Sequence, residues 1–77
     1  MPTQIEARYL SGNDINKTIS GTDKDGYNFK GKMINLECTE EEIMLFIVDD
    51  KGQFLSTVNP HDTVTLDGNM RRPGTQP

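Results

Sequence analysis

The chain has little of what cross-links a small protein. It has 77 residues, no tryptophan and a single cysteine, Cys38. One cysteine excludes an intrachain disulfide, and no cluster of cysteine and histidine predicts a structural zinc site. No cofactor is expected either. Because so short a chain rarely stabilises itself by its core alone, we expect oligomerisation to supply part of the stability.

Long hydrophobic runs are also missing. No apolar segment approaches the roughly 18 residues of a transmembrane helix, and no basic region followed by an apolar stretch marks a secretory signal. We therefore expect a cytoplasmic protein without a membrane partner. Hydrophobic residues make up only 32% of the chain. The sequence predicts one small domain over residues 1–66 and a flexible tail over residues 67–77.

Basic residues are in the minority. Eight Lys and Arg stand against twelve Asp and Glu, which gives a net charge of −4. Nucleic-acid-binding proteins usually carry a basic footprint, so the overall charge argues against such a partner. The run Glu40–Glu42 is interpreted as a solvated acidic loop. Only Lys30, Lys32 and the tail pair Arg71-Arg72 could supply a local basic surface.

What the sequence does contain is a series of short β-strand patterns. We predict strands at about residues 16–22, 27–37, 43–49, 53–58 and 63–66. Asp25-Gly26 is a strong hairpin signal, and polar or proline-containing turns separate the later strands. The sequence therefore predicts a mainly β protein, a small and strongly bent five-stranded antiparallel barrel.

The second predicted strand contains the signs of a bend. Tyr27, Phe29, Gly31 and Met33 share one face by alternation, and the two aromatic residues are expected in the core. A glycine in mid-strand predicts a bend or a close backbone approach. The alternation slips between Met33 and Leu36, which is typical of a bulge.

Two further segments raise specific expectations. Residues 43–48 are continuously apolar, which is typical of a strand buried on both faces. Residues 3–11 fit two patterns. Thr3 to Glu6 matches a helical capping box with Gly12 as a stop, which favours a short helix. Ile5, Ala7 and Tyr9 also alternate with polar residues, which would make an extra strand.

The ordered strands resemble the Sm/LSm family of small β-barrels, which includes the Hfq proteins. Residues 24–37 follow the order and spacing of that family's first motif, with Phe29 at its aromatic position, Gly31 at its bent-strand glycine and Glu37 at its aspartate. The segments 45–49 and 58–66 match its buried strand and its closing strand. The resemblance covers residues 16–66. It implies a ring of roughly five to seven subunits that binds RNA or DNA.

The residues of the family's base-binding pocket are not present. The turn over residues 38–44 is longer and acidic, and it lacks the usual asparagine. Asn59-Pro60 replaces the Arg-Gly of the second motif. The candidate nucleic-acid-binding residues are therefore others: Asn59 and His61 in a turn, and Lys30, Lys32 and Asn35 on a strand. Each also has a plain structural interpretation as a turn or surface residue.

Two functions follow as hypotheses. The first is a non-enzymatic Sm-like ring for nucleic-acid binding or processing, its subunits paired through edge strands 53–58 and 63–66. The second is a small structural or protein–protein interaction module without a nucleic-acid role, of which a viral accessory protein, for example from a phage, is one version. Catalytic residues are not expected, because no nucleophile–base set or glycine-rich phosphate loop is present.

Overall fold

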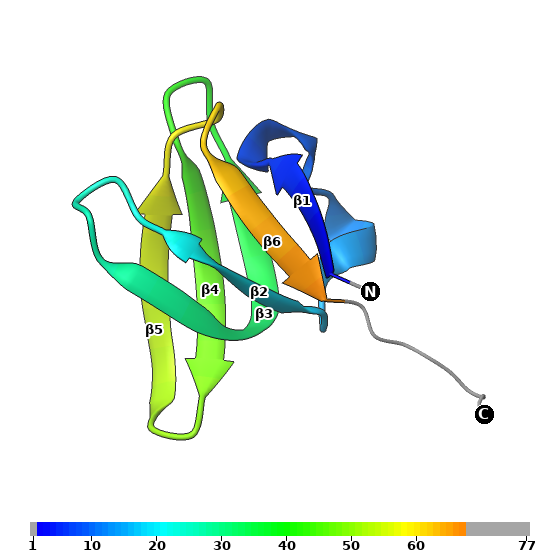
Figure 1. Cartoon of the computed structure of the whole chain (residues 1–77), viewed down its shortest axis with the longest axis vertical. Helices are drawn as coiled ribbons and strands as arrows, with labels where there is room; N and C mark the ends of the chain where they lie inside the picture. The colour runs from blue at the N-terminus through cyan, green and yellow to red at the C-terminus, as the bar shows by residue number, and fades with distance from the viewer. Residues whose placement is uncertain (1, 68–77) are drawn as a thin grey trace.

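The protein folds as one antiparallel sheet. The computed structural model describes residues 2–67, and the predicted tail beyond Asp67 lies outside them. Six strands run in the spatial order β1-β6-β2-β3-β4-β5. Their bounds are Pro2–Glu6 for β1, Thr18–Thr22 for β2, Asn28–Cys38 for β3, Ile43–Asp49 for β4, Gly52–Val58 for β5 and Thr63–Asp67 for β6. The sheet is strongly curled (Figure 1), and its two edges are β1 and β5.

Strands β2 to β6 begin and end within two residues of the predicted ranges. The five-strand count was too low, because residues 2–6 add β1 on the far side of β6. The favoured N-terminal helix was wrong. After β1 come only two short 3₁₀ turns, η1 at Ala7–Tyr9 and η2 at Gly12–Asp14. Tertiary pairing with β6 prevails here over a weak local helix signal.

The core lies on the concave face of the sheet. It contains eleven buried hydrophobic residues from all strands except β1 and from the turn region after it: Ala7, Leu10, Ile19, Phe29, Met33, Ile43, Leu45, Ile47, Val58, Val64 and Leu66. Tyr27 was expected among them but is 72% exposed. Tyr27 lies in the turn before β3, and its backbone N–H donates to the Asp23 side chain at 2.9 Å. A turn residue does not follow the alternation of a strand, so its side chain has no fixed side of the sheet.

Strand β3 bends where the sequence predicts it. A Cβ atom on Gly31 would lie 2.6 Å from the carbonyl oxygen of Val48, so only glycine allows this approach. The register between β3 and β4 shifts between Met33 and Asn35, which confirms the predicted bulge. The bend lets one long strand pair with β2 over its first half and with β4 over its second.

The burial of β4 differs from the prediction. Ile43, Leu45 and Ile47 are buried in the core, whereas Met44, Phe46 and Val48 are only half-buried and point to the other face. A continuous apolar run predicts burial on both faces, but among the described residues the chain covers only one. The prediction of two covered faces was therefore wrong for the isolated chain.

The predicted edge strands are also only half right. β5 is an edge, but β6 pairs with β1 on one side and with β2 on the other. On the β1 side the segment 63–66 is paired throughout, and on the β2 side residues 65 and 66 are paired as well. β6 is not an edge because β1 pairs with residues 63–67.

Candidate functional site

The turn between β5 and β6 holds two of the predicted site residues. The Asn59 backbone N–H donates to Oδ2 of Asp62 at 3.0 Å, and the Asp62 N–H donates to the Asn59 carbonyl at 3.0 Å. Asn59 therefore closes a tight turn through its backbone, which explains the residue without a ligand. His61 stands at the tip, its side chain 77% exposed.

His61 lies beside groups of mixed charge. Its Nδ1 is 3.6 Å from Oε1 of Glu6, and the same oxygen is 2.7 Å from Nε of Arg8. The Arg8 guanidinium sits over the ring of Tyr9, 4.8 Å from its centroid. These neighbours come from β1 and η1. They are held there because Ala7 and Arg8 donate backbone hydrogen bonds to the β5–β6 turn.

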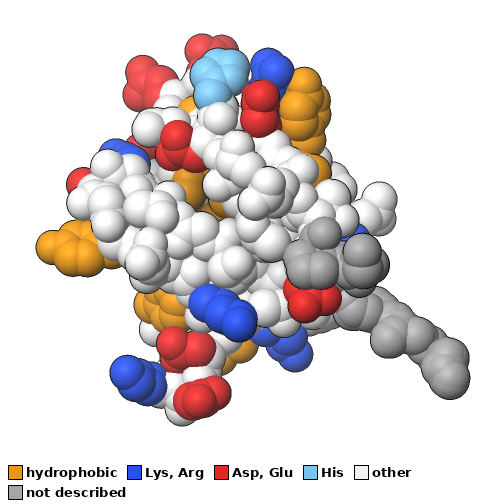
Figure 2. All heavy atoms as spheres, viewed as in Figure 1, with side chains coloured by type: hydrophobic (Ala, Val, Ile, Leu, Met, Phe, Trp, Pro, Cys, Tyr) orange, Lys and Arg blue, Asp and Glu red, His pale blue; other side chains and the backbone are white. Residues whose placement is uncertain are grey.

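The acidic loop Glu40–Glu42 lies at the same end of the molecule. The β3–β4 and β5–β6 turns are neighbours in Figure 1, and Figure 2 shows acidic side chains next to the histidine there. Thr39 stabilises the loop, since its Oγ1 accepts the Glu42 N–H at 3.0 Å. The electrostatic field at this end does not favour a polyanion.

Lys30, Lys32 and Asn35 lie on β3, away from His61. Both lysines are exposed, as predicted. Lys32 pairs with Val48, next to the β4–β5 turn, and that turn is at the opposite end from the β5–β6 turn (Figure 1). The Leu36 backbone N–H donates to Oδ1 of the neighbouring Asn35 at 2.8 Å. The structure thus separates the candidates into two groups and does not assemble one site.

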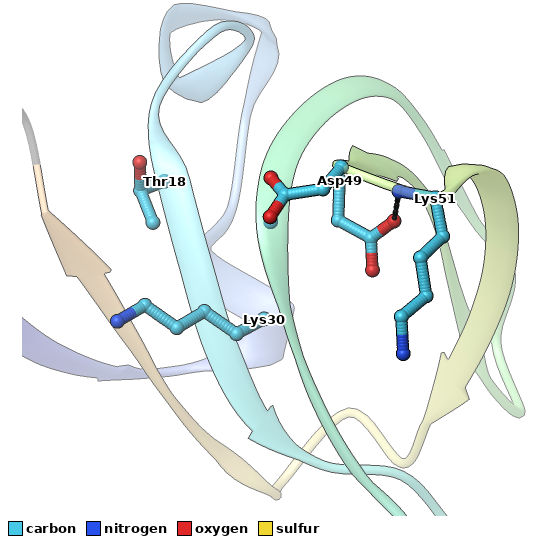
Figure 3. A pocket seen from close by; sticks show the side chains of 6 residues that line it. Thr18, Lys30, Asp49 and Lys51 are labelled. Carbon is cyan, nitrogen blue, oxygen red and sulfur yellow. Dashed lines mark hydrogen bonds between the residues drawn. The ribbon is translucent and has the colours of Figure 1, made fainter.

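A hollow of about 400 Å³ opens beside Lys30. Its lining consists of Thr18, Lys30, Gly31, Asp49, Asp50 and Lys51. In Figure 3 the Lys30 and Lys51 ammonium groups point away from each other, and a carboxylate oxygen of Asp49 accepts the Lys51 backbone N–H at 2.8 Å. Two acidic residues accompany the two cations, so the hollow does not present converging donors to a phosphate.

Sequence reasoning missed the exposed apolar side of β4 and β5. We call Met44, Phe46, Val48 and Leu55 the outer apolar surface. Leu55 lies opposite Phe46 across the strand pair and is 53% exposed. β5 carries no charged residue. Phe54 and Leu55 are consecutive in β5, so the sequence could have indicated an apolar side chain on each face of the sheet. Which of the two faces stays uncovered depends on the whole fold.

The described residues hold one thiol and no cluster of metal-ligating side chains. Within residues 2–67, no three His, Cys, Asp or Glu side chains gather into a metal site. Cys38 is a free and exposed thiol at the end of β3. None of the helical turns in this range is long or apolar enough to cross a membrane.

Comparisons of this chain with protein-family models, with curated proteins and with solved structures found no match. The resemblance to the Sm/LSm family therefore stays a prediction, based on the residues quoted for it.

Proposed function

We propose that this chain is a non-enzymatic β domain that binds protein, and first of all other copies of itself. The observation that carries the proposal is the outer apolar surface. Half of the apolar run in β4 faces away from the core, and Leu55 beside it is more than half exposed. Contiguous apolar side chains on a surface mark interaction sites in soluble proteins.

The size of the chain supports the same proposal. The described core is small, and neither a disulfide nor a metal site reinforces it among residues 2–67. Association with a second surface is the remaining common way to bury more apolar area. The strand order β6-β2-β3-β4-β5, with the bend at Gly31, also supports a small bent barrel of the Sm-like or SH3-like kind as the class of fold.

Sedimentation equilibrium over a wide concentration range tests the proposal. We expect the mass to rise above that of one chain, and to fall in Phe46→Lys, because a charge on the outer apolar surface opposes its burial. Thr63→Lys is the control, since Thr63 is an exposed strand residue away from this surface. A wild-type protein that stays a monomer throughout would contradict the proposal.

A second candidate function is nucleic-acid binding by a ring. Lys30 and Lys32 are both exposed at alternate positions of β3, and a ring would repeat this pair in every subunit. Pairing of 53–58 with 63–66 between subunits would require β1 to leave the edge of β6. The acidic net charge and the mixed charges around Lys30 favour the first candidate.

A further inference from the structure

The backbone N–H and C=O groups that point outward from the free edge of β5 can be assigned to particular residues. In antiparallel strands, successive residues direct their N–H and C=O groups alternately toward one neighbour and the other. The Thr57 carbonyl accepts the Lys24 N–H at 2.9 Å, so it points away from β4. By alternation, Gln53 and Leu55 also direct their backbone groups outward. Both are exposed, and no strand pairs with them on that side.

The other edge of the sheet is protected. β1 begins with Pro2, which has no N–H to donate, and it ends where η1 turns the chain away after Glu6. Proline and charge are common devices that keep an edge strand from pairing. β5 has neither, since its seven residues are Gly52 to Val58 and all are uncharged.

We propose that β5 pairs antiparallel with β5 of a second copy of this chain, around a two-fold axis at Phe54. This inference rests on the proposed function, because it names the partner and the surface of self-association. Gln53 of each copy lies opposite Leu55 of the other, and each such pair exchanges two N–H···O=C hydrogen bonds. The two sheets become one continuous sheet across the axis.

The contact with Lys24 argues against the neighbouring register with its axis at Leu55. An axis at Leu55 would place Gln53 opposite Thr57 of the second copy and would require the Thr57 carbonyl, which already accepts the Lys24 N–H. An axis at Phe54 uses only Gln53 and Leu55. The β2–β3 turn therefore limits the free edge to the part of β5 before Thr57.

The side chains favour a second copy as the occupant. Two-fold pairing brings identical strands together, and an uncharged strand meets no like charge when it pairs with itself. The two Leu55 side chains lie diagonally across the axis on the same face, within reach of each other. Each remains next to Phe46 of its own chain, so the outer apolar surfaces of both copies become continuous.

The test compares variants at the two edges by sedimentation equilibrium, in reductant because Cys38 is exposed. We expect wild type to form a dimer, and Leu55→Lys to raise its dissociation constant by at least about tenfold. The matched control is Gln4→Lys, the same new charge at the exposed β1 edge, which should leave the constant unchanged. Hydrogen exchange then gives the register, because an axis at Phe54 protects the Gln53 and Leu55 amides at dimer concentrations and not that of Thr57.

Each result has a definite meaning. Loss of the dimer in Leu55→Lys alone, with protection at the two expected amides, supports the proposal. Three results would overturn the pairing at Phe54 and leave the proposed function standing. The dimer could persist in Leu55→Lys, it could be lost in Gln4→Lys, or the Thr57 amide could be protected as well. A wild-type monomer at all concentrations overturns both. Circular dichroism of each variant confirms that a lost dimer is not a lost fold.

Discussion

The backbone N–H of Lys24 donates a hydrogen bond of 2.9 Å to the carbonyl oxygen of Thr57 and so joins the β2–β3 turn to the edge strand β5. The side chain of Lys24 is fixed as well, because its Nζ lies 3.0 Å from Oε1 of Glu42. Lys24 thus links the β2–β3 turn, the β3–β4 turn and the edge strand β5. Strand pairing alone does not connect the β2–β3 turn with β5.

The first prediction concerns the pH dependence of this link. The hydrogen bond and the charge of Glu42 raise the pKa of the Lys24 ammonium above its ordinary value of 10.5. Because the pKa is raised in the folded protein, the contribution of the pair to stability is complete below pH 10.5, as long as Glu42 is ionised, and is lost as the pH rises through the folded pKa. Glu42→Gln should return the Lys24 pKa toward its ordinary value, which an NMR titration of the lysine side chain measures. Glu41→Gln is the control and should leave it raised.

The second prediction concerns the bend in β3. Gly31→Ala places a Cβ 2.5 Å from Cγ2 of Ile47 and 2.6 Å from the Val48 carbonyl oxygen. The backbone of β4 would have to move, so we expect a loss of about 2 kcal/mol or more in the free energy of unfolding. Gly12→Ala is the control, because a Cβ there meets no atom within 4 Å. Equal urea midpoints for the two variants would show that the close approach is not needed.

The third prediction concerns the capping box of η2. Asp14 is only 8% exposed; its Oδ2 accepts the Ser11 N–H at 3.0 Å and its Oδ1 lies 3.0 Å from Nζ of Lys17. Asp14→Ala should destabilise the fold by about 1–2 kcal/mol, because a backbone donor loses its partner. Asp14→Asn keeps an acceptor for Ser11 and should cost less. Thermal unfolding of the two variants separates the cap from the ion pair, since both variants lose the charge and only Asp14→Ala loses the acceptor. Equal losses of stability in the two variants would show that the charge, and not the cap, carries the effect.

The fourth prediction addresses nucleic-acid binding. If the second candidate function holds, Lys30→Ala with Lys32→Ala should weaken binding of labelled single-stranded RNA and DNA, and binding should fall steeply with salt. Asn59→Ala with His61→Ala tests the other group, at the opposite end of the sheet (Figure 1). Fluorescence anisotropy at two salt concentrations measures both. Absence of binding by the wild type at low salt would exclude this function and leave protein binding.

Local sequence was sufficient for the strands from Thr18 to Asp67, since alternation, turn residues and the glycine at position 31 all act over a few neighbouring residues. It was not sufficient for residues 3–11. There the helical and extended patterns were nearly balanced, and the decision came from pairing with β6, a segment 57 to 65 positions away. Tyr27 was misplaced for a similar reason, because a turn interrupts the alternation that would put it in the core.

The sites required more than local sequence. That Lys30 and Lys32 are exposed on one strand follows from a period of two. Their separation from Asn59 and His61 follows from the direction of β4 and β5, which places the two turns at opposite ends. The sequence by itself determined the β class, the turns, the bend and the apolar character of β4. Only the tertiary structure decided that β6 is covered by β1, that β5 stays open and that half of the β4 apolar residues face outward, because strand neighbours and sheet faces are set by pairing between distant segments.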